Sequence, residues 1–428
     1  MKRVPIPAMC LAGAALFAVV QTRAWADAGP SVPEARVVKD KVQGKAFAFD
    51  LSQVQLLDGP FKHAQDLDRR DLMACNADNF LYPFRREAKL PNPGTGSDAL
   101  DYTRTGHVVG HYLSAAAFLI RNTGDAELKK KADDMVASVA ECQKAMGDGF
   151  VGGFPEQQML VLERVVPANG PRAGVPWYCL HKIYAGLLDM YVLTGNKQAL
   201  DVVSKAADWA IKNTDALTDV QFQAMLQTEH GGMNEVLANL YAATGQEKYL
   251  KLSERFNHHA MIDAFAEGGD SLERKHANTQ FPKFIGVSRQ YELTGDAVFG
   301  KIAHSFWSDV VYERSYVTGG NSLGEQFTPK ALLSTAVGRN TTETCNEYNM
   351  LKLTRSLFTQ DPKAEYADYF ERTLYNQILS ARNPETGGEL YFQQLQTGSR
   401  KGPWLEMNKA LQCCFGSGME SNAKYADG

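Results

Sequence analysis

The segment Tyr241-Ala242-Ala243-Thr244-Gly245-Gln246 (residues 241–246) ends one run of helical periodicity and begins another. The same tyrosine, threonine and glycine pattern recurs 50 residues before and 50 residues after it, with glycines at Gly195 and Gly295. Glycine often ends a helix because it adopts the left-handed backbone conformation without steric cost. Helical hairpins repeated at this period predict a stacked or closed array. Roughly five to six such units predict an all-α fold, an (α/α)6 toroid or barrel.

The first residues have the features of a secretory signal peptide. Lys2 and Arg3 precede an apolar run over residues 8–20, and small residues at Ala24 and Ala26 follow it. The run is too short to span a membrane. We therefore expect a signal peptide over residues 1–26, an N-terminal extension over 27–46 and one main domain over 47–428. The protein is expected to be exported, to the periplasm or the extracellular space, without a membrane span.

The charge balance argues against nucleic acid as a partner. The whole chain has 45 basic and 49 acidic side chains, and removal of the signal peptide takes away three basic residues and no acidic one. The remaining 42 against 49 give a net charge of −7 with neutral histidine. An acidic chain lacks the basic surface that binds a phosphate backbone. The sequence does not indicate the oligomeric state.

A helix start is predicted at Thr344, because Glu347 follows it at the spacing of a capping box before an apolar-periodic run. This places Cys345 in the first helical turn and Glu343 just before the helix. A thiol at a helix N-terminus is favoured as the thiolate by the helix dipole.

Two adjacent cysteines, Cys413 and Cys414, precede a Gly-Ser-Gly run that we interpret as a flexible loop. With Glu343 and Cys345 they provide three thiolates and one carboxylate, which are ligand types that zinc takes. Plain buried thiols and disulfides are the alternatives, because an even number of cysteines in an exported chain is also what disulfides give. No role is predicted for the three other cysteines of the mature chain, Cys75, Cys142 and Cys179.

Four longer stretches closely resemble the bacterial β-L-arabinofuranosidases of glycoside hydrolase families 127 and 146. They are residues 276–280 (His-Ala-Asn-Thr-Gln), 316–327 (Tyr-Val-Thr-Gly-Gly-Asn-Ser-Leu-Gly-Glu-Gln-Phe), 343–355 and 413–420. The resemblance extends from about Phe47 to the last residue, and it also implies the (α/α)6 barrel. Members of these families continue into β-rich, β-sandwich modules, so this chain is expected to be a C-terminally truncated form without them.

The resemblance implies a retaining hydrolase that releases L-arabinofuranose from plant-derived, arabinose-containing oligosaccharides or polysaccharides. It implies Cys413 as the nucleophile and Glu325 as the acid/base. It also implies a zinc ion held by Glu343, Cys345, Cys413 and Cys414. Zinc keeps a coordinated thiol deprotonated at neutral pH.

Further residues are implied as contacts of the sugar ring: His181, Glu235 and His276, with Tyr391 near the nucleophile or the sugar. Trp177 lies in an aromatic-rich segment suited to stacking on a sugar. The residues themselves leave other roles open, because His181 and Glu235 open predicted helices and could cap them. Tyr391 and Trp177 could equally be core residues.

Three alternatives follow from the same residues. A different (α/α)6 glycosidase or a polysaccharide lyase would use a carboxylate pair such as Glu235 and Glu325. A non-catalytic sugar-binding protein would hold the same site residues as disulfides or structural metal ligands. His107 and His111, at i and i+4 on one helix, could bind a separate metal, but they are better explained by helix packing or sugar contacts.

Overall fold

The computed structural model describes residues 36–95, 105–163, 174–330, 332–407, 409 and 412–427. The predicted signal peptide and the first part of the predicted extension lie outside these residues. Most of the described part is helical, and its one sheet is a short antiparallel pair of strands, β1 (Glu389–Leu390) and β2 (Trp404–Leu405). None of the helices in this part has both the length and the apolarity needed to cross a membrane.

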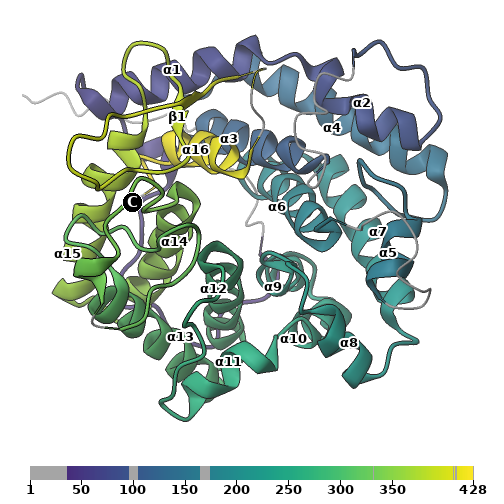
Figure 1. The fold of residues 1–428 in the computed structure, drawn as a ribbon. Coiled ribbons are helices and arrows are strands. Elements are labelled where there is room, and N and C mark those ends of the chain that lie inside the picture. The colour runs from purple at the N-terminus through teal and green to yellow at the C-terminus, as the bar shows by residue number, and fades with distance from the viewer. Residues whose placement is uncertain are drawn as a thin grey trace, which may run out of the picture.

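Six helices form an inner ring, which confirms the (α/α)6 prediction (Figure 1). Each helix packs against the next, and the last packs against the first. In ring order they are α3 (His107–Thr123), α6 (Pro176–Thr194), α9 (Met233–Thr244), α12 (Ala277–Thr294), α14 (Thr344–Gln360) and α16 (Cys413–Ala423). These helices are buried on nearly all sides, whereas ordinary surface helices bury one face.

An outer layer covers the ring. Its helices are α1 (Pro60–Ala74), α4 (Ala126–Met146), α7 (Lys197–Thr214), α10 (Glu247–Arg255), α13 (Ala297–Asp309) and α15 (Ala364–Thr373). The connections also carry α2 (Ala77–Glu87), α5 (Gln157–Leu162), α8 (Asp219–Met225) and α11 (His259–Ala266). Short 3-10 turns occur at Leu51–Gln53 and Leu333–Thr335, and π-helical turns at Val310–Arg314 and Leu374–Leu379.

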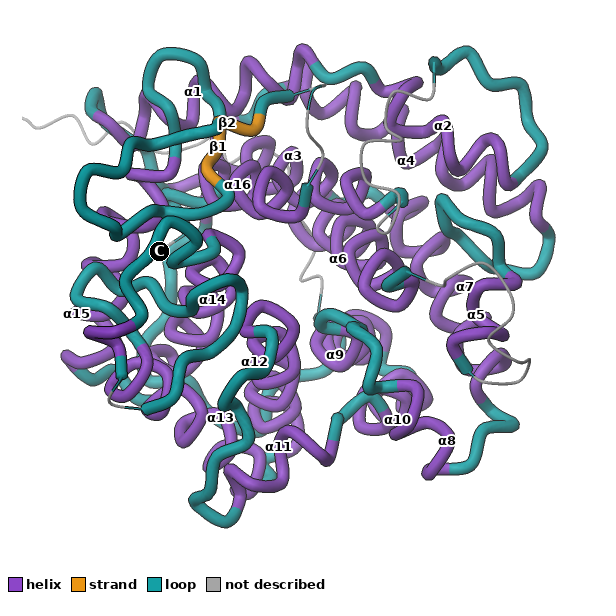
Figure 2. The backbone as a smooth tube through the Cα atoms, viewed as in Figure 1, coloured by secondary structure: helices purple, strands orange, loops and turns teal. Residues whose placement is uncertain are grey.

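The predicted Thr-Gly turns link inner helices to outer ones. Gly195, Gly245 and Gly295 end α6, α9 and α12 with φ values of 74°, 70° and 73°. The next residue is the N-cap of the outer helix, and the side chains of Asn196 and Asp296 cap α7 and α13 in this way. Because these turns are tight, the longer connections all lead from outer helices back to inner ones. The N-terminal ends of the inner helices therefore lie beneath the long loops (Figure 2).

Helices α3 and α6 make the closest helix contact of the ring. A Cβ atom on Gly110 would lie 2.0 Å from the carbonyl oxygen of Lys182, and one on Gly186 would lie 2.3 Å from the carbonyl oxygen of Gly110. Real Cβ atoms do not approach backbone this closely, so glycine is required where the two backbones touch.

The segment 36–48 crosses the ring at the C-terminal ends of the inner helices, opposite the long loops. Backbone amides of Val37, Val42 and Lys45 donate to carbonyl oxygens of α9, α12 and α14, all near the C-terminal ends of those helices. This segment covers the C-terminal end of the ring and leaves the N-terminal end to the long loops.

Candidate active site and metal centre

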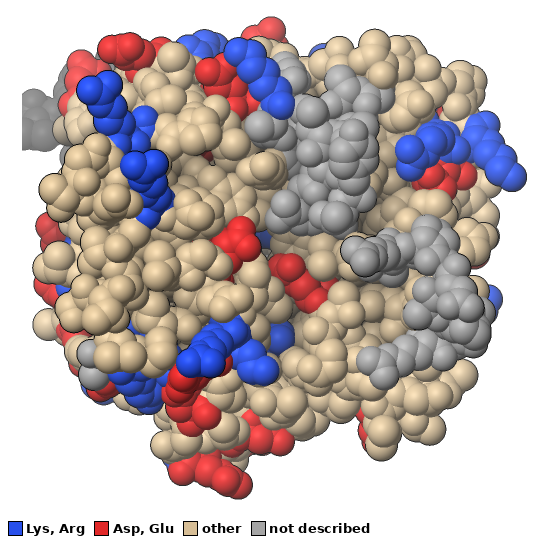
Figure 3. Space-filling view, viewed as in Figure 1, with Lys and Arg blue, Asp and Glu red and all other residues tan. Residues whose placement is uncertain are grey.

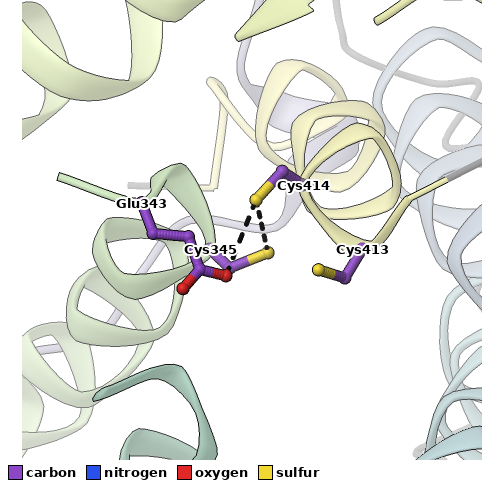
Figure 4. Close-up of side chains that lie close together, drawn as sticks. All are labelled: Glu343, Cys345, Cys413 and Cys414. Carbon is purple, nitrogen blue, oxygen red and sulfur yellow. Dashed lines mark hydrogen bonds between the residues drawn. The ribbon is translucent and has the colours of Figure 1, made fainter. Parts of the chain in front are cut away.

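Glu343, Cys345, Cys413 and Cys414 come together where α14 and α16 begin (Figure 4). Their four candidate ligand atoms all lie within 4.8 Å of one another. The sulfur of Cys345 is 3.2 Å from that of Cys414, which is 3.7 Å from Oε1 of Glu343. All four residues are buried. The predicted four-residue cluster is therefore present.

The cluster fits a tetrahedral divalent metal ion. With metal–sulfur distances of about 2.3 Å, tetrahedral ligand atoms lie about 3.8 Å apart, which is within the range observed here. Oε2 of Glu343 is buried and has no hydrogen-bond partner. An unpaired buried carboxylate oxygen is costly, and a cation beside it would compensate for that cost.

Electrostatics support the same interpretation. Burial raises the pKa of Glu343, Cys345 and Cys414 well above their ordinary values, and neighbouring acidic groups add to the effect. Several acidic groups held this close in a dry site cannot all be charged without a compensating cation. Three thiols and one carboxylate form the kind of ligand set that binds zinc.

Two predictions about the local structure around this cluster, the flexible loop and the capping box, were wrong. Residues 413–423 form the helix α16 rather than a flexible loop. Gly416 and Gly418 are needed for packing, because a Cβ atom would lie 2.4 Å from the ring of His111 and 2.6 Å from the carboxyl group of Glu389. Glycine here allows α16 to fit tightly into the ring.

The capping box is also absent, although α14 does begin at Thr344. The hydroxyl of Thr344 donates to the carbonyl oxygen of Leu390 at 2.9 Å. The side chain of Glu347 instead accepts a hydrogen bond from the backbone amide of Asn321 at 3.1 Å. Both side chains therefore fasten neighbouring loops to the helix start.

A cavity of about 230 Å³ opens beside the cluster. Since liquid water occupies about 30 Å³ per molecule, this cavity has room for about seven waters or one small sugar ring. Its lining residues are Val175, Tyr178, Glu229, His276, Asn278, Glu325, Glu343, Tyr391 and Cys413. Figure 3 shows acidic side chains beside the hollow in the middle of this face.

Glu325 faces this cavity from a strained loop. Its φ is 68°, an unusual value for a residue with a side chain, and its carbonyl oxygen accepts from the amide of Ala277 at 2.7 Å. Its carboxylate accepts a hydrogen bond from the hydroxyl of Tyr391 at 2.6 Å and lies 3.4 Å from Nε2 of His276. The contact with His276, more than that with Tyr391, lowers the pKa of Glu325.

Tyr391 also approaches the metal cluster. Its hydroxyl oxygen is 4.0 Å from the sulfur of Cys413. Burial opposes the charged form of His276, but the contact with Glu325 and nearby acidic groups outweighs it and raises the pKa of His276. The carboxylate of Glu325 and the sulfur of Cys413 therefore face the same cavity with one hydroxyl between them.

Three predicted sugar contacts lie elsewhere. Trp177 is 1% exposed, donates to the sulfur of Met225 and packs edge-on against Phe256, so the stacking prediction is wrong. His181 is buried against the turn before α9 and does not line the cavity. Glu235 pairs with Lys352 at 2.8 Å and lines a separate cavity beneath segment 36–48.

Three polar residues of the cavity lining, besides the apolar Val175, were missed by the sequence analysis. Tyr178 follows Trp177 in α6, and one helical residue turns the side chain by about 100°, which moves it from the core to the cavity. Asn278 lies in the 276–280 stretch at the start of α12. Glu229 stands just before a Gly-Gly turn, and no pattern in the sequence marked it.

One histidine of α3, His111, contacts both helix α16 and the cavity residue Tyr178. Nδ1 of His111 is 2.5 Å from Oε1 of Glu420 on α16, and its Nε2 is 3.3 Å from the hydroxyl of Tyr178. The hydroxyl of Tyr348 donates to the other carboxyl oxygen of Glu420. Neither His107 nor His111 belongs to a possible metal-binding group in the described part of the chain.

The cysteines outside the cluster have no part in the site. Cys75, Cys142 and Cys179 are buried, and none of the six described cysteines forms a disulfide. The disulfide alternative is therefore not realised in this structure.

Comparisons with known proteins identify the family that this chain resembles. The family described as "Beta-L-arabinofuranosidase, GH127 catalytic domain" matches residues 53–427. A non-reducing end β-L-arabinofuranosidase from Bifidobacterium longum subsp. longum is 26% identical over 336 residues, which are 67% of this chain and 47% of that protein.

Solved structures share the fold. The crystal structure of a GH127 β-L-arabinofuranosidase from Geobacillus stearothermophilus T6 is 19% identical with a TM-score of 0.68, covering 88% of this chain and 65% of that one. The GH127 β-arabinofuranosidase BT3674 is 20% identical with a TM-score of 0.69, covering 87% and 60%. The chain thus spans about half the length of the curated relative that it matches.

Proposed function

The chain belongs to the β-L-arabinofuranosidase family of GH127 catalytic domains, and we propose that it hydrolyses β-L-arabinofuranosides with retention of configuration. One observation carries the proposal. A buried cysteine of a metal-type cluster and a hydrogen-bonded glutamate face the same sugar-sized cavity, with Tyr391 between them. This is the arrangement that double displacement needs, with a nucleophile and an acid/base acting on one bond.

Glu343, Cys345, Cys413 and Cys414 would hold a zinc ion. When bound, zinc keeps the sulfur of Cys413 deprotonated at neutral pH, whereas a free thiol with a pKa of about 8.5 would be mostly protonated. Of the three cluster cysteines, only Cys413 lines the cavity. This assigns Cys413 as the nucleophile and leaves Cys345 and Cys414 as ligands.

In the first step, the sulfur of Cys413 attacks the anomeric carbon and the glycosidic carbon–oxygen bond breaks. Glu325, whose pKa is lowered by His276 and Tyr391 and which must therefore take up a proton before this step, gives that proton to the leaving oxygen. The sugar is then held on Cys413 as a thioether. In the second step, Glu325 takes a proton from water, the water oxygen attacks the anomeric carbon, and the thiolate of Cys413 leaves.

Tyr391 and His276 would orient the acid/base. Both contact the carboxylate of Glu325, at 2.6 Å and 3.4 Å. Two contacts restrict the orientation of the carboxyl group more than its rotamer preference alone would. Reaction rates depend steeply on the position of a catalytic group. The strained backbone at Glu325 fits a residue held for function.

The substrate class follows from the family. We propose terminal L-arabinofuranose on plant-derived oligosaccharides or polysaccharides, released by an exported enzyme. The apolar run over residues 8–20 with small residues near Ala26 supports export. The alternative of a carboxylate pair formed by Glu235 and Glu325 has no support, because Glu235 lines a different cavity from Glu325.

Site variants test the proposal. Wild-type protein is expected to cleave an aryl β-L-arabinofuranoside and a β-L-arabinofuranosyl disaccharide, with the β-anomer appearing first by NMR. Cys413→Ser should abolish turnover of both. Glu325→Gln should spare the first step with the aryl substrate, whose leaving group needs no protonation, and should slow the second step, in which Glu325 is the base. Cys142→Ser, a cysteine of the core, is the matched control. Inversion of configuration, or near-normal turnover by Cys413→Ser, would contradict the mechanism.

A further inference from the structure

A second cavity borders Glu325 and Tyr391, and none of the four cluster residues lines it. It measures about 500 Å³ and is lined by Glu325, Arg339, Asn340, Tyr391, Phe392, Gln394, Gly402, Pro403, Leu405 and Gln412. Glu325 and Tyr391 line both cavities, so the two spaces meet at the acid/base. The second cavity is about twice as large as the 230 Å³ first one, which makes room for about two sugar residues.

The position of this cavity assigns it to the leaving group. An acid that protonates the glycosidic oxygen must stand beside that oxygen, between the released sugar and the rest of the glycan. Cys413 lines only the first cavity. If the released sugar occupies the first cavity, the remainder of the substrate continues past Glu325 into the second.

The second cavity has one positively charged side chain that could bind a substrate. Arg339 is its single cationic residue, is exposed, and takes part in no ion pair with any described residue. The carboxylate of Glu325 is already engaged by Tyr391 and His276. A guanidinium group presents a planar pair of donors that matches a carboxylate. Arg339 is thus available to bind an anionic group on the substrate.

The other lining residues suit a sugar. Asn340, Gln394 and Gln412 offer amide groups, and the side chains of Phe392 and Pro403 offer apolar faces for the C–H side of a ring. The amide nitrogen of Gln394 donates to the carbonyl oxygen of Gly402 at 3.0 Å, which leaves its own oxygen to accept from a hydroxyl.

The loop that carries Arg339 is fixed on both sides. The carbonyl oxygen of Gly338 accepts from the amide of Leu395 at 3.0 Å, and that of Asn340 accepts from the amide of Gly324 at 2.7 Å. The second contact joins the Arg339 loop directly to the loop of Glu325. The backbone on both sides of Arg339 is therefore held relative to the loop of the acid/base before substrate arrives.

We propose that this cavity is a leaving-group subsite that selects glycans in which the sugar next to the arabinofuranose carries a carboxylate, bound by Arg339. The inference rests on the proposed function, and it adds to that function a preference for a negatively charged sugar next to the arabinofuranose. Neutral leaving groups would occupy the same space without the ion pair.

A matched pair of substrates tests the proposal: a β-L-arabinofuranosyl uronic acid disaccharide and its neutral methyl ester, with an aryl β-L-arabinofuranoside as a third probe. The wild type is expected to prefer the acid to the ester by about tenfold in kcat/KM. This preference lies between the effect expected for an exposed ion pair and that expected for a buried one. The preference should shrink at 1 M salt, where the Debye length falls to about 3 Å.

Variants assign the preference to its residue. Arg339→Gln should bring the acid-to-ester ratio close to one, Arg339→Lys should keep part of it, and Arg400→Gln is the control because Arg400 is exposed and outside the cavity. An acid-to-ester ratio of kcat/KM near one in the wild type, or an unchanged ratio in Arg339→Gln, overturns the inference. In either case, cleavage of the aryl substrate would still support the proposed function. A wild type that cleaves none of the three substrates contradicts the proposed function itself.

Discussion

Replacing Tyr391 with phenylalanine removes one oxygen atom from the centre of the site and leaves the ring in place. That oxygen donates to Glu325 at 2.6 Å and lies 4.0 Å from the sulfur of Cys413. A hydrogen bond to a charged group contributes about 1.5–3 kcal/mol. Since about 1.4 kcal/mol corresponds to a tenfold change in rate, we expect kcat/KM on a disaccharide to fall about 10- to 100-fold.

The substrates separate the two contacts of the hydroxyl. If Tyr391 acts by holding Glu325, an aryl substrate that needs no proton should lose much less activity than the disaccharide. If it acts on Cys413, both substrates should lose activity equally. Tyr184→Phe is the control, because it removes a hydroxyl bonded to the carbonyl oxygen of Ala206 at 2.7 Å in the core. Activity of Tyr391→Phe within about twofold of this control on both substrates would refute the reasoning.

Three further predictions concern the metal, the core and the pH dependence of stability. Purified wild-type protein should contain about one zinc per chain by elemental mass spectrometry, and the Cys345→Ser variant should contain none. Absence of zinc from the wild-type protein would contradict the four-ligand site. Gly110→Ala places a Cβ atom 2.0 Å from a backbone oxygen and should lower the free energy of unfolding by about 1–3 kcal/mol, so an unchanged urea midpoint would count against the backbone contact of α3 and α6. Burial, and then Lys283, lower the pKa of His258 to about 3. The unfolded imidazole binds its proton first, near pH 6.5, so this histidine should reduce stability by up to about 1.4 kcal/mol per pH unit as the pH falls from 6.5 toward 3. Urea titrations at pH 7 and 5 should show a smaller pH dependence for His258→Asn than for the wild type, and equal dependence would contradict the assignment.

The helical repeat was predictable because its signal is local. A tyrosine, a threonine and a glycine at fixed spacing report a helix end, and Gly195, Gly245 and Gly295 all adopt the expected conformation. Closure of the ring had no such signal. Helix α16 contains Gly416 and Gly418, which suggested a loop, and only the packing against His111 and Glu389 explains them.

The metal cluster was predictable for a different reason. Residue type alone left plain buried thiols and disulfides open for Glu343, Cys345 and the two adjacent cysteines, and the resemblance of stretches 343–355 and 413–420 to a known family decided between them. The sugar contacts depended on which way each helix faces. Trp177 and Tyr178 are neighbours in one aromatic segment, and the rotation of α6 places the first in the core and the second at the cavity. Sequence alone does not determine that rotation.

Helix α16 joins the two ends of the described chain. It packs against α1 and α3 from the beginning of the fold and against α14 from late in it, and it supplies Cys413 and Cys414. During synthesis, a chain that has emerged only as far as α14 holds Glu343 and Cys345, which is half of a ligand set. A metal ion bound by all four residues would therefore add its binding energy to the closed ring alone. A metal ion held by all four residues would be retained only by the closed ring, so metal retention in a pulse-chase experiment would report when the toroid closes.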